Sequence, residues 1–227
     1  MSHPSHAVTS GSASKVSESG LYRGRKIPKA VIKRLSLYAR ALKLFSVNRI
    51  EKLSSQELGD TLGINSAQVR KDLAYFGQFG VPGVGYYVED LRKRIKSILG
   101  TDSTVRIALI GVGNLGQALL SYASFRQEGF VFVAAFDSDK RKVGGERSGV
   151  PVFHESELAE RLQEIGVDIV ILAVPVHAVQ PLADVVIGAG VQAILNFVPV
   201  RLVVPEHVKV HYVDLTIEIE SLSYYLK

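Results

Sequence analysis

The chain has 227 residues, of which 47% are hydrophobic, so it is long enough to bury one or two cores. It contains no cysteine, which excludes a disulfide framework, a zinc–thiolate site and a thiol nucleophile. Residues 21–100 carry sixteen Lys or Arg against six Asp or Glu, giving +10, whereas residues 101–227 carry ten against fifteen, giving −5. A basic half joined to an acidic half predicts two domains, of which the first faces a polyanion.

Residues 1–22 are expected to form a disordered tail. The segment is rich in Ser, Gly and His and lacks the apolar region of a secretory signal. The longest apolar runs, such as residues 169–176, are far shorter than the roughly 20 residues of a membrane-spanning helix. The sequence therefore favours a cytoplasmic protein that does not enter a membrane.

Residues 23–100 predict a winged helix-turn-helix domain, which begins with a helix at Pro28. Apolar residues follow at helical spacing with cations between them: Val31, Leu35, Tyr38, Leu42 and Phe45. Ser54 and Glu57 have the spacing of a capping box, so a short helix should start there and run to Leu62. Gly63 can end that helix and Asn65 can cap the next one, which completes a helix-turn-helix.

The second of these helices has the pattern of a DNA-recognition helix. Its inner face is Val69, Leu73 and Phe76, and its outer face is Ala67, Arg70, Lys71 and Ala74. The small residues let the backbone lie close in a major groove, where Arg70 can reach a guanine edge or a phosphate and Lys71 a phosphate. Gln68 can read a base from the side of this face or reach back to the Asn65 cap. A merely solvated helix face is the alternative, and the surrounding +10 charge favours DNA.

The glycine-rich segment 78–88 predicts a wing, with turn residues between two short strands. A helix is then expected from Glu89 to Leu99 and should end at Gly100. Its inward residues are Leu91, Ile95 and Ile98.

Residues 101–214 predict a Rossmann-type domain, an α/β fold with a doubly wound parallel sheet. The sequence "GVGNLG" follows an apolar strand and opens a helix, as a dinucleotide-binding turn does. Gly111 permits the tight turn, Gly113 lets the backbone approach a pyrophosphate and Gly116 lets the helix pack against the strand. The predicted contacts of this turn with the nucleotide are Gly111, Val112, Gly113, Asn114, Leu115 and Gly116.

A second strand ends at Asp137, twenty-one residues after Gly116. A carboxylate there can accept both ribose hydroxyls and repels a 2′-phosphate, which favours NAD(H) over NADP(H). The nearby cations Lys140, Arg141 and Lys142 leave NADP(H) open.

Strand and helix patterns continue to alternate up to residue 214. Ligands of open parallel sheets lie beyond the carboxyl ends of the strands. This rule marks Val174, Pro175, Asn196, Phe197 and Asp214 as residues that line the nicotinamide side.

The sequence offers little catalytic machinery. His177 is the best candidate acid or base, but a lone histidine at the start of a helix is more often a capping or solvated residue. The other histidines have no metal-ligand spacing. We therefore interpret the nucleotide as a signal, with no enzyme activity and no metal. The alternatives are an NAD-dependent oxidoreductase with an accessory N-terminal domain, and a nucleotide-binding scaffold that does not contact DNA.

Residues 215–227 predict a terminal helix with an apolar stripe of Leu215, Ile219, Leu222 and Leu226. The stripe can fold back on its own domain or dock on a second subunit. A dimer would suit an operator with two-fold symmetry.

The motifs "QVRKDLAYFG", "GVGY", "GVGNLG", "FD", "VP" and "NFVPV", in this order, resemble the family of redox-sensing transcriptional repressors called Rex, from about Lys26 to the C-terminus. The resemblance implies a homodimer with a winged helix and a Rossmann domain. It also implies that the protein binds palindromic, double-stranded operator DNA and is released when NADH binds.

Carried over by position, the resemblance implies a switch pair of Tyr86 and Asp214, with Arg40 as the partner of that carboxylate in the DNA-bound state. Arg40 and Gly85 are thereby expected at the DNA, and Tyr86 at the cofactor. The helix 215–227 is implied to be swapped between subunits. Leu215 stands where some members carry Phe beneath the nicotinamide, so stacking on that side is expected to differ.

Overall fold

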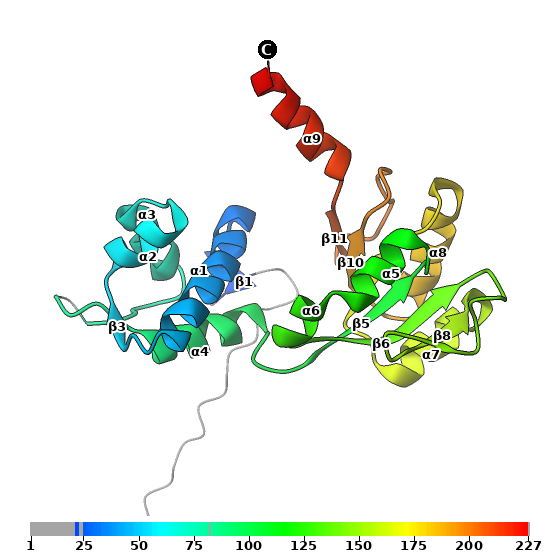
Figure 1. Ribbon diagram of the computed structural model, residues 1–227, viewed down its shortest axis with the longest axis horizontal. Helices are drawn as coiled ribbons and strands as arrows, with labels where there is room; N and C mark the ends of the chain where they lie inside the picture. Colours follow the sequence, from blue (N-terminus) through cyan, green and yellow to red (C-terminus); the bar gives the residue numbers. More distant parts are fainter. Residues whose placement is uncertain (1–20, 23–24, 82, 227) are drawn as a thin grey trace, which may run out of the picture. The chain divides into compact units, whose positions relative to one another are not determined.

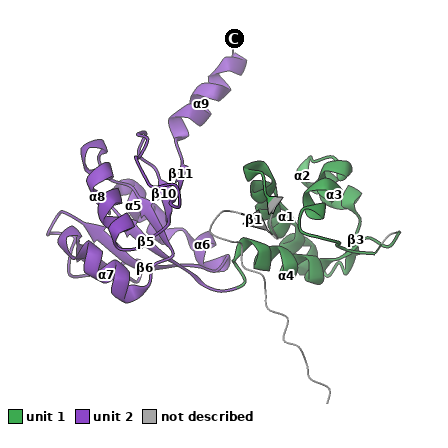
Figure 2. Ribbon diagram, turned by 180° about the vertical axis from the view of Figure 1, so that it is seen from behind, with its two compact units in different colours: residues 1–102 green, residues 103–227 purple. Residues whose placement is uncertain are grey.

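The computed structural model describes residues 21–22, 25–81 and 83–226. The chain divides into two compact units, unit 1 (residues 1–102) and unit 2 (residues 103–227) (Figure 2). Each has its own hydrophobic core. Of the predicted tail, residues 1–20 lie outside the described residues, whereas Leu21–Tyr22 form β1, which pairs antiparallel with β2 (Arg25–Lys26).

Unit 1 contains the predicted helices. After β1 and β2 its elements are α1 (Lys29–Val47), β3 (Lys52–Leu53), α2 (Ser55–Leu62), α3 (Ser66–Ala74), β4 (Tyr86–Tyr87) and α4 (Val88–Leu99) (Figure 1). The expected stripe of α1 is buried at Val31, Leu35, Tyr38 and Leu42, with Phe45 partly buried. It packs with Leu91 and Ile95 of α4 in one core. Pro28 precedes α1, and the left-handed Gly100 ends α4, as predicted.

The glycine-rich segment after α3 differs from the predicted pair of short strands. It supplies one strand, β4, which pairs with β3. In the sequence, β3 precedes the helix-turn-helix and β4 follows it. Among the other described residues of the segment, Val81 and Gly85 form an isolated antiparallel bridge. A Cβ at Gly85 would lie 2.5 Å from the carbonyl oxygen of Leu53, so the backbone of the segment lies directly against β3 at this residue.

Unit 2 is built on a sheet of seven strands in the order β11-β10-β9-β5-β6-β8-β7. Its elements are β5 (Val105–Ile110), α5 (Asn114–Ser121), α6 (Ala123–Gln127), β6 (Phe130–Asp137), β7 (Glu146–Arg147), β8 (Val150–His154), the 3-10 helix η1 (Glu155–Glu157), α7 (Leu158–Ile165), β9 (Ile169–Leu172), α8 (Val176–Gly188), β10 (Ala193–Asn196) and β11 (Lys209–Tyr212). All pairs are parallel except the edge strand β7. The parallel strands follow the Rossmann order, which confirms the predicted doubly wound sheet.

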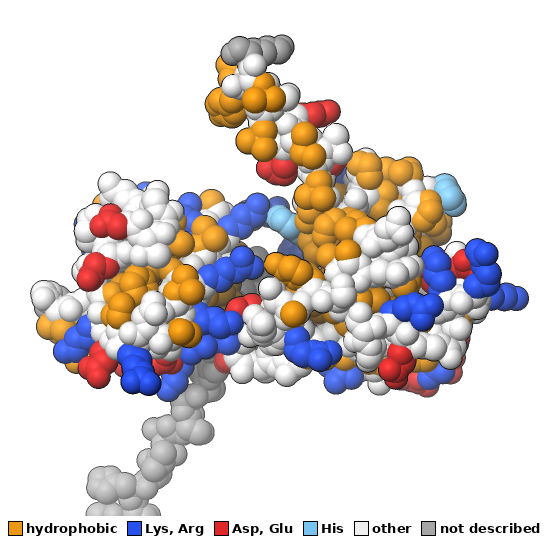
Figure 3. Space-filling model, viewed as in Figure 1, with side chains coloured by type: hydrophobic (Ala, Val, Ile, Leu, Met, Phe, Trp, Pro, Cys, Tyr) orange, Lys and Arg blue, Asp and Glu red, His pale blue; other side chains and the backbone are white. Residues whose placement is uncertain are grey.

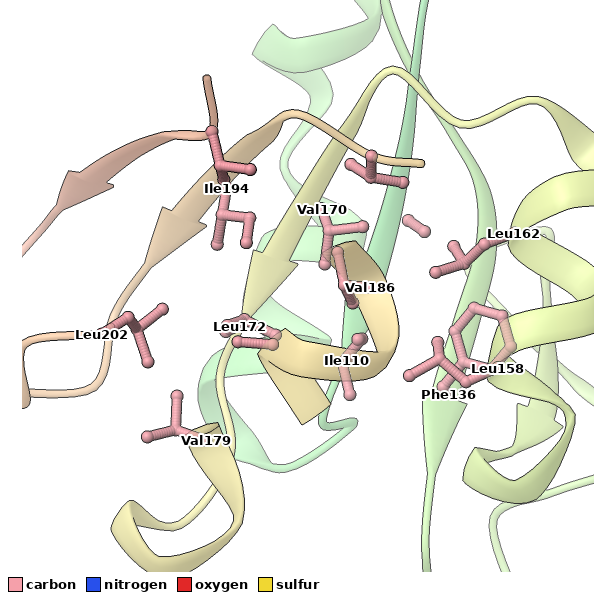
Figure 4. Packing of buried hydrophobic residues seen from close by; sticks show 14 of the residues in the cluster. Ile110, Phe136, Leu158, Leu162, Val170, Leu172, Val179, Val186, Ile194 and Leu202 are labelled. Atoms are coloured by element: carbon pink, nitrogen blue, oxygen red, sulfur yellow. The ribbon is translucent and has the colours of Figure 1, made fainter. Parts of the chain in front are cut away.

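Alternate residues of the central strand β5 enter two different cores. Ala108 and Ile110 pack in a cluster with residues of α7 and α8, part of which is drawn in Figure 4. Ile107 and Leu109 pack in a second cluster with Leu120 of α5. A strand buried on both faces reads as a continuous apolar run, which is why "VRIALI" was recognisable in the sequence.

The chain ends in α9 (Leu215–Ser223) and the 3-10 helix η2 (Tyr224–Leu226) (Figure 1). The Asp214 carboxylate caps α9 by accepting a hydrogen bond from the Thr216 backbone N–H at 2.9 Å. The stripe residues Leu215, Ile219, Leu222 and Leu226 are 61%, 67%, 64% and 86% exposed. The helix therefore does not fold back on its own unit. None of the helices formed by the described residues is long and apolar enough to span a bilayer.

Candidate functional sites

The helix-turn-helix forms through the local signals that the sequence predicted. The Ser54 backbone N–H donates to the Glu57 carboxylate at 2.7 Å, and the Glu57 N–H donates to Ser54 Oγ at 3.1 Å, which is a complete capping box. The left-handed Gly63 ends α2. The Asn65 side chain then caps α3 by accepting from the Ala67 N–H at 2.7 Å.

Helix α3 presents small and cationic residues to solvent. Val69, Leu73 and Phe76 are buried, whereas Ala67, Arg70, Lys71 and Ala74 are exposed. The Arg70 guanidinium donates to Ser55 Oγ at 2.8 Å, so it rests across the start of α2. Lys and Arg side chains also spread over the rest of unit 1 on the face shown in Figure 3. The exposed face of α3 therefore has the small side chains and the positive charge that entry into a major groove requires.

Gln68 does not reach back to the Asn65 cap, which corrects that expectation. Its Nε2 donates to Asp72 Oδ1 at 2.6 Å, because a carboxylate one turn later on the same helix is a stronger acceptor. Gln68 is half-buried in this position. One N–H of Nε2 is engaged in this bond, which leaves the other N–H and Oε1 of Gln68 for a base.

Asp72 is a fully buried carboxylate that sequence reasoning missed. It accepts hydrogen bonds from Arg34 Nη2 and from the Tyr38 hydroxyl, both at 2.8 Å, and a third from Arg34 Nε. Burial raises the pKa of Asp72, but the hydrogen bonds from Arg34, Tyr38 and Gln68 outweigh burial and hold that pKa below its ordinary value. The available signal was an acidic residue beside the apolar positions of α3, matched by Arg34 and Tyr38 one turn apart on α1. This cluster fixes α3 against α1.

Three residues of unit 1 that were predicted at the DNA or at the switch lie outside α3. Arg40 is exposed on α1. Gly85, with φ of 95°, belongs to the Val81–Gly85 bridge. Tyr86 is 9% exposed, and burial raises the pKa of its hydroxyl although the charge of Arg70 lowers it. Arg40 and Tyr86 belong to unit 1 and Asp214 to unit 2, so the switch pair stays a prediction.

The turn after β5 has the geometry of a phosphate-binding turn. A Cβ at Gly111 would lie 2.3 Å from the Ala173 carbonyl oxygen, and one at Gly116 would lie 2.0 Å from the Gly111 carbonyl oxygen. Both glycines are thus required by the packing of the chain itself. A Cβ at Gly113 would meet nothing within 4 Å, so the space over this residue is open to a ligand.

The first turn of α5 supplies hydrogen-bond donors next to this open space. The first bond of the helix is made by the Gln117 N–H to the Gly113 carbonyl oxygen, at 2.9 Å. The N–H groups of Asn114, Leu115 and Gly116 precede it and are the ones that a helix leaves free at its start. Asn114 and Leu115 are exposed. These groups, Gly113 and the Val112 backbone that leads to them fit the pyrophosphate of a dinucleotide.

Asp137 ends β6 beside this turn. Its Oδ2 accepts from the Val112 N–H at 2.8 Å and from Lys142 Nζ at 2.9 Å, and its Oδ1 accepts from the Asp139 N–H at 2.9 Å. Burial raises the pKa of Asp137, but the bonds from Lys142, Asp139 and Val112 together lower it below its ordinary value. The carboxylate therefore stays charged where a ribose would lie.

The loops after β9 and β10 open at the same edge of the sheet, because Ile110, Leu172 and Asn196 are in register. Val174 is half-buried and Pro175 is exposed at the start of α8. Phe197 is half-buried in the loop after β10. These residues lie at the carboxyl end of the sheet, and their contact with a nicotinamide stays a prediction.

Asn196 is buried and hydrogen-bonds to its own loop. Its side chain is 0% exposed, donates to the carbonyl oxygens of Val198 and Val200 at 3.1 Å each, and accepts from the Val198 N–H at 2.9 Å. Because both amide donors are used by its own loop, the Asn196 side chain fixes the shape of that loop. That Asn196 lines the nicotinamide side stays a prediction.

His177 is exposed in the first turn of α8. Among the residues that the structure describes, no three His, Asp or Glu side chains are grouped so that they could hold a metal ion.

The chain matches known proteins in both units. A family described as "Putative DNA-binding protein N-terminus" matches residues 26–74, and one described as "CoA binding domain" matches residues 102–200. The redox-sensing transcriptional repressor Rex of Anoxybacillus flavithermus is 45% identical over 202 residues, which cover 89% of this chain and 95% of the relative. The protein of the same name from Bacillus pumilus is 43% identical over 203 residues, which cover 89% and 94%.

Solved structures of RSP, a Rex-family repressor, are similar over nearly the same extent. Its complex with β-NAD⁺ and operator DNA is 38% identical with a TM-score of 0.84, covering 88% of this chain and 92% of that chain. Its complex with β-NADH is 36% identical with a TM-score of 0.79, covering 88% and 94%.

Proposed function

The chain belongs to the family of redox-sensing transcriptional repressors called Rex, and from this premise we propose that unit 1 binds operator DNA and that NADH binding to unit 2 releases it. One observation carries the proposal. The chain joins an exposed cationic recognition face on α3 to a turn at Gly113 that leaves room for a pyrophosphate next to free helix N–H groups. The nucleotide acts as a ligand and not as a reagent, in keeping with relatives that are named repressors.

The adenosine half of the site cannot distinguish NADH from NAD⁺, because that half is the same in both. Discrimination must come from the nicotinamide end, where the two forms differ in charge and ring geometry. The residues at that end are Val174, Pro175, Phe197 and Asp214, with Tyr86 and Arg40 as the switch partners of Asp214. To turn DNA occupancy from nearly full to nearly empty, NADH must favour the released state by about 5.5 kcal/mol. By linkage, DNA must weaken NADH binding equally.

We also infer that the protein acts as a homodimer through α9. The four stripe residues of α9 and η2 are all more than 60% exposed, although a group of side chains of that size is usually covered. A second copy of the chain supplies a partner of matching symmetry, and a dimer can place two α3 helices in successive major grooves.

The proposal is tested with a fluorescent palindromic duplex. Protein is added until the duplex is bound, and NADH or NAD⁺ is then titrated at fixed salt, because salt alone changes DNA affinity strongly. We expect two chains per duplex and release by NADH at concentrations at which NAD⁺ leaves the complex intact. Indifference of the complex to both nucleotides would contradict the switch, and one chain per duplex would contradict the dimer.

Arg70→Ala is expected to weaken operator binding about tenfold or more and to leave NADH affinity nearly unchanged, because a specific Arg contact is worth ~1–3 kcal/mol. Duplex titration and NADH fluorescence measure the two affinities separately. Arg70→Lys is the matched variant, since it keeps the charge and loses the planar fork of donors. If Arg70→Ala lowers both affinities together, the assignment of Arg70 to the DNA face is wrong.

A further inference from the structure

The segment after β6 folds back on the strand end that it leaves. The Asp139 carboxylate accepts from the backbone N–H and the Nε of Arg141, each at 3.0 Å. The Lys142 N–H donates to the Asp139 carbonyl oxygen at 2.9 Å, which closes a tight turn. The turn returns the Lys142 ammonium to Asp137, with which it forms an ion pair at 2.9 Å, and the Lys142 side chain is still 31% exposed.

The Asp137 carboxylate is nearly saturated in this arrangement. A carboxylate has about four lone-pair sites. Three are used, by the N–H groups of Val112 and Asp139 and by the Lys142 ammonium. A ribose presents two hydroxyls to such a carboxylate, so one of the three donors has to leave. The two backbone donors are held by the fold, whereas Lys142 reaches Asp137 on a flexible stem.

Lys142 is also the cation best placed to meet a phosphate on the ribose. A 2′-phosphate would lie against the Asp137 carboxylate and be repelled by it. Arg141 is paired with Asp139, and its side chain is 89% exposed. Lys142, once displaced from Asp137, can pair with that phosphate when the ribose carries one.

We propose that Lys142 sets how strongly this site discriminates between NADH and NADPH. In the free protein, Lys142 pairs with Asp137. When NADH binds, Lys142 leaves the carboxylate and the ribose hydroxyls donate to it. When NADPH binds, Lys142 pairs with the 2′-phosphate. NADPH is thereby a second, weaker ligand of the same site. The inference deepens the proposed function and rests on it, because it assumes that the site takes NADH.

The test is Lys142→Met in the full chain, with NADH and NADPH titrated separately by their fluorescence at one salt concentration. We expect the dissociation constant of NADH to change by less than about threefold, because the variant removes a competitor of the ribose rather than a contact. We expect that of NADPH to rise at least about tenfold, equivalent to about 1.4 kcal/mol. Lys142→Arg should retain NADPH binding.

Lys140→Met is the matched control. It removes the same charge from an exposed position two residues away that makes no ion pair with Asp137. An equal effect of both variants on NADPH would overturn the inference, since it would mean that only overall charge matters. An unchanged ratio of the two affinities in Lys142→Met would overturn it too. Failure of the unaltered protein to bind NADH would instead contradict the proposed function.

Discussion

Gly113→Ala is expected to weaken NADH binding about a hundredfold or more, equivalent to about 2.7 kcal/mol, while the unfolding temperature of the chain stays the same. Gly113 has φ of −80°, which alanine adopts without strain, and a Cβ there would meet no atom of the chain within 4 Å. The protein therefore tolerates the methyl group, but the pyrophosphate that has to approach this backbone does not. Titration with NADH and a thermal melt measure the two effects.

Substitutions of two other glycines are controls for this prediction. Gly145→Ala adds a methyl group at another open position of unit 2 and should change neither property. Gly116→Ala puts a Cβ 2.0 Å from the Gly111 carbonyl oxygen, so it should lower the unfolding temperature as well as NADH affinity. Full NADH affinity in Gly113→Ala would show that the nucleotide does not lie over this turn.

Asp72→Ala is expected to destabilise unit 1 by about 3–5 kcal/mol, as removal of one partner from a buried ion pair does. The substitution leaves the Tyr38 hydroxyl, on a side chain that is 0% exposed, without its acceptor, and frees Arg34 from α3. Amide hydrogen exchange of α1 and α3 in the full chain should then quicken by about two orders of magnitude or more. Operator binding should fall with it, because α3 loses its anchor on α1.

Asp60→Ala is the matched control for this prediction. Asp60 is an exposed carboxylate on the neighbouring helix α2, where it accepts one hydrogen bond from Gln56. Its removal should cost about 0.5 kcal/mol or less. Similar exchange rates in Asp72→Ala and the unaltered protein would contradict the anchoring role of Asp72.

The same carboxylate predicts a dependence of stability on pH. Because the pKa of Asp72 is lowered in the folded protein, its contribution is present above the pKa of the unfolded chain and is lost as the pH falls through the folded value. The difference in exchange rate between the unaltered protein and Asp72→Ala should therefore be full at neutral pH and shrink below about pH 4.

The sequence alone determined the elements whose signals are local. The capping box at Ser54, the strand that leads into the glycine turn at Gly111 and the strand that ends at Asp137 were predicted at the right places. Each depends on residues within a few positions of one another, where spacing and apolar content reflect the geometry directly. The exposed face of α3 was predictable for the same reason, since a helix of known period shows its faces in the sequence.

Only the tertiary structure decided how distant groups pair. Arg34 and Asp72 are thirty-eight residues apart, and no local pattern indicates that α1 offers the partners of a carboxylate on α3. The pairing of β4 with β3 likewise depends on packing, as do the two hydrogen bonds that Asn196 Nδ2 donates to its own loop. Lys142 was visible in the sequence as one of three neighbouring cations, but which of them reaches Asp137 depends on the turn at Asp139. A carboxylate or an amide binds the donors that the folded chain brings to it, and their identity follows from the path of the backbone rather than from their order along it.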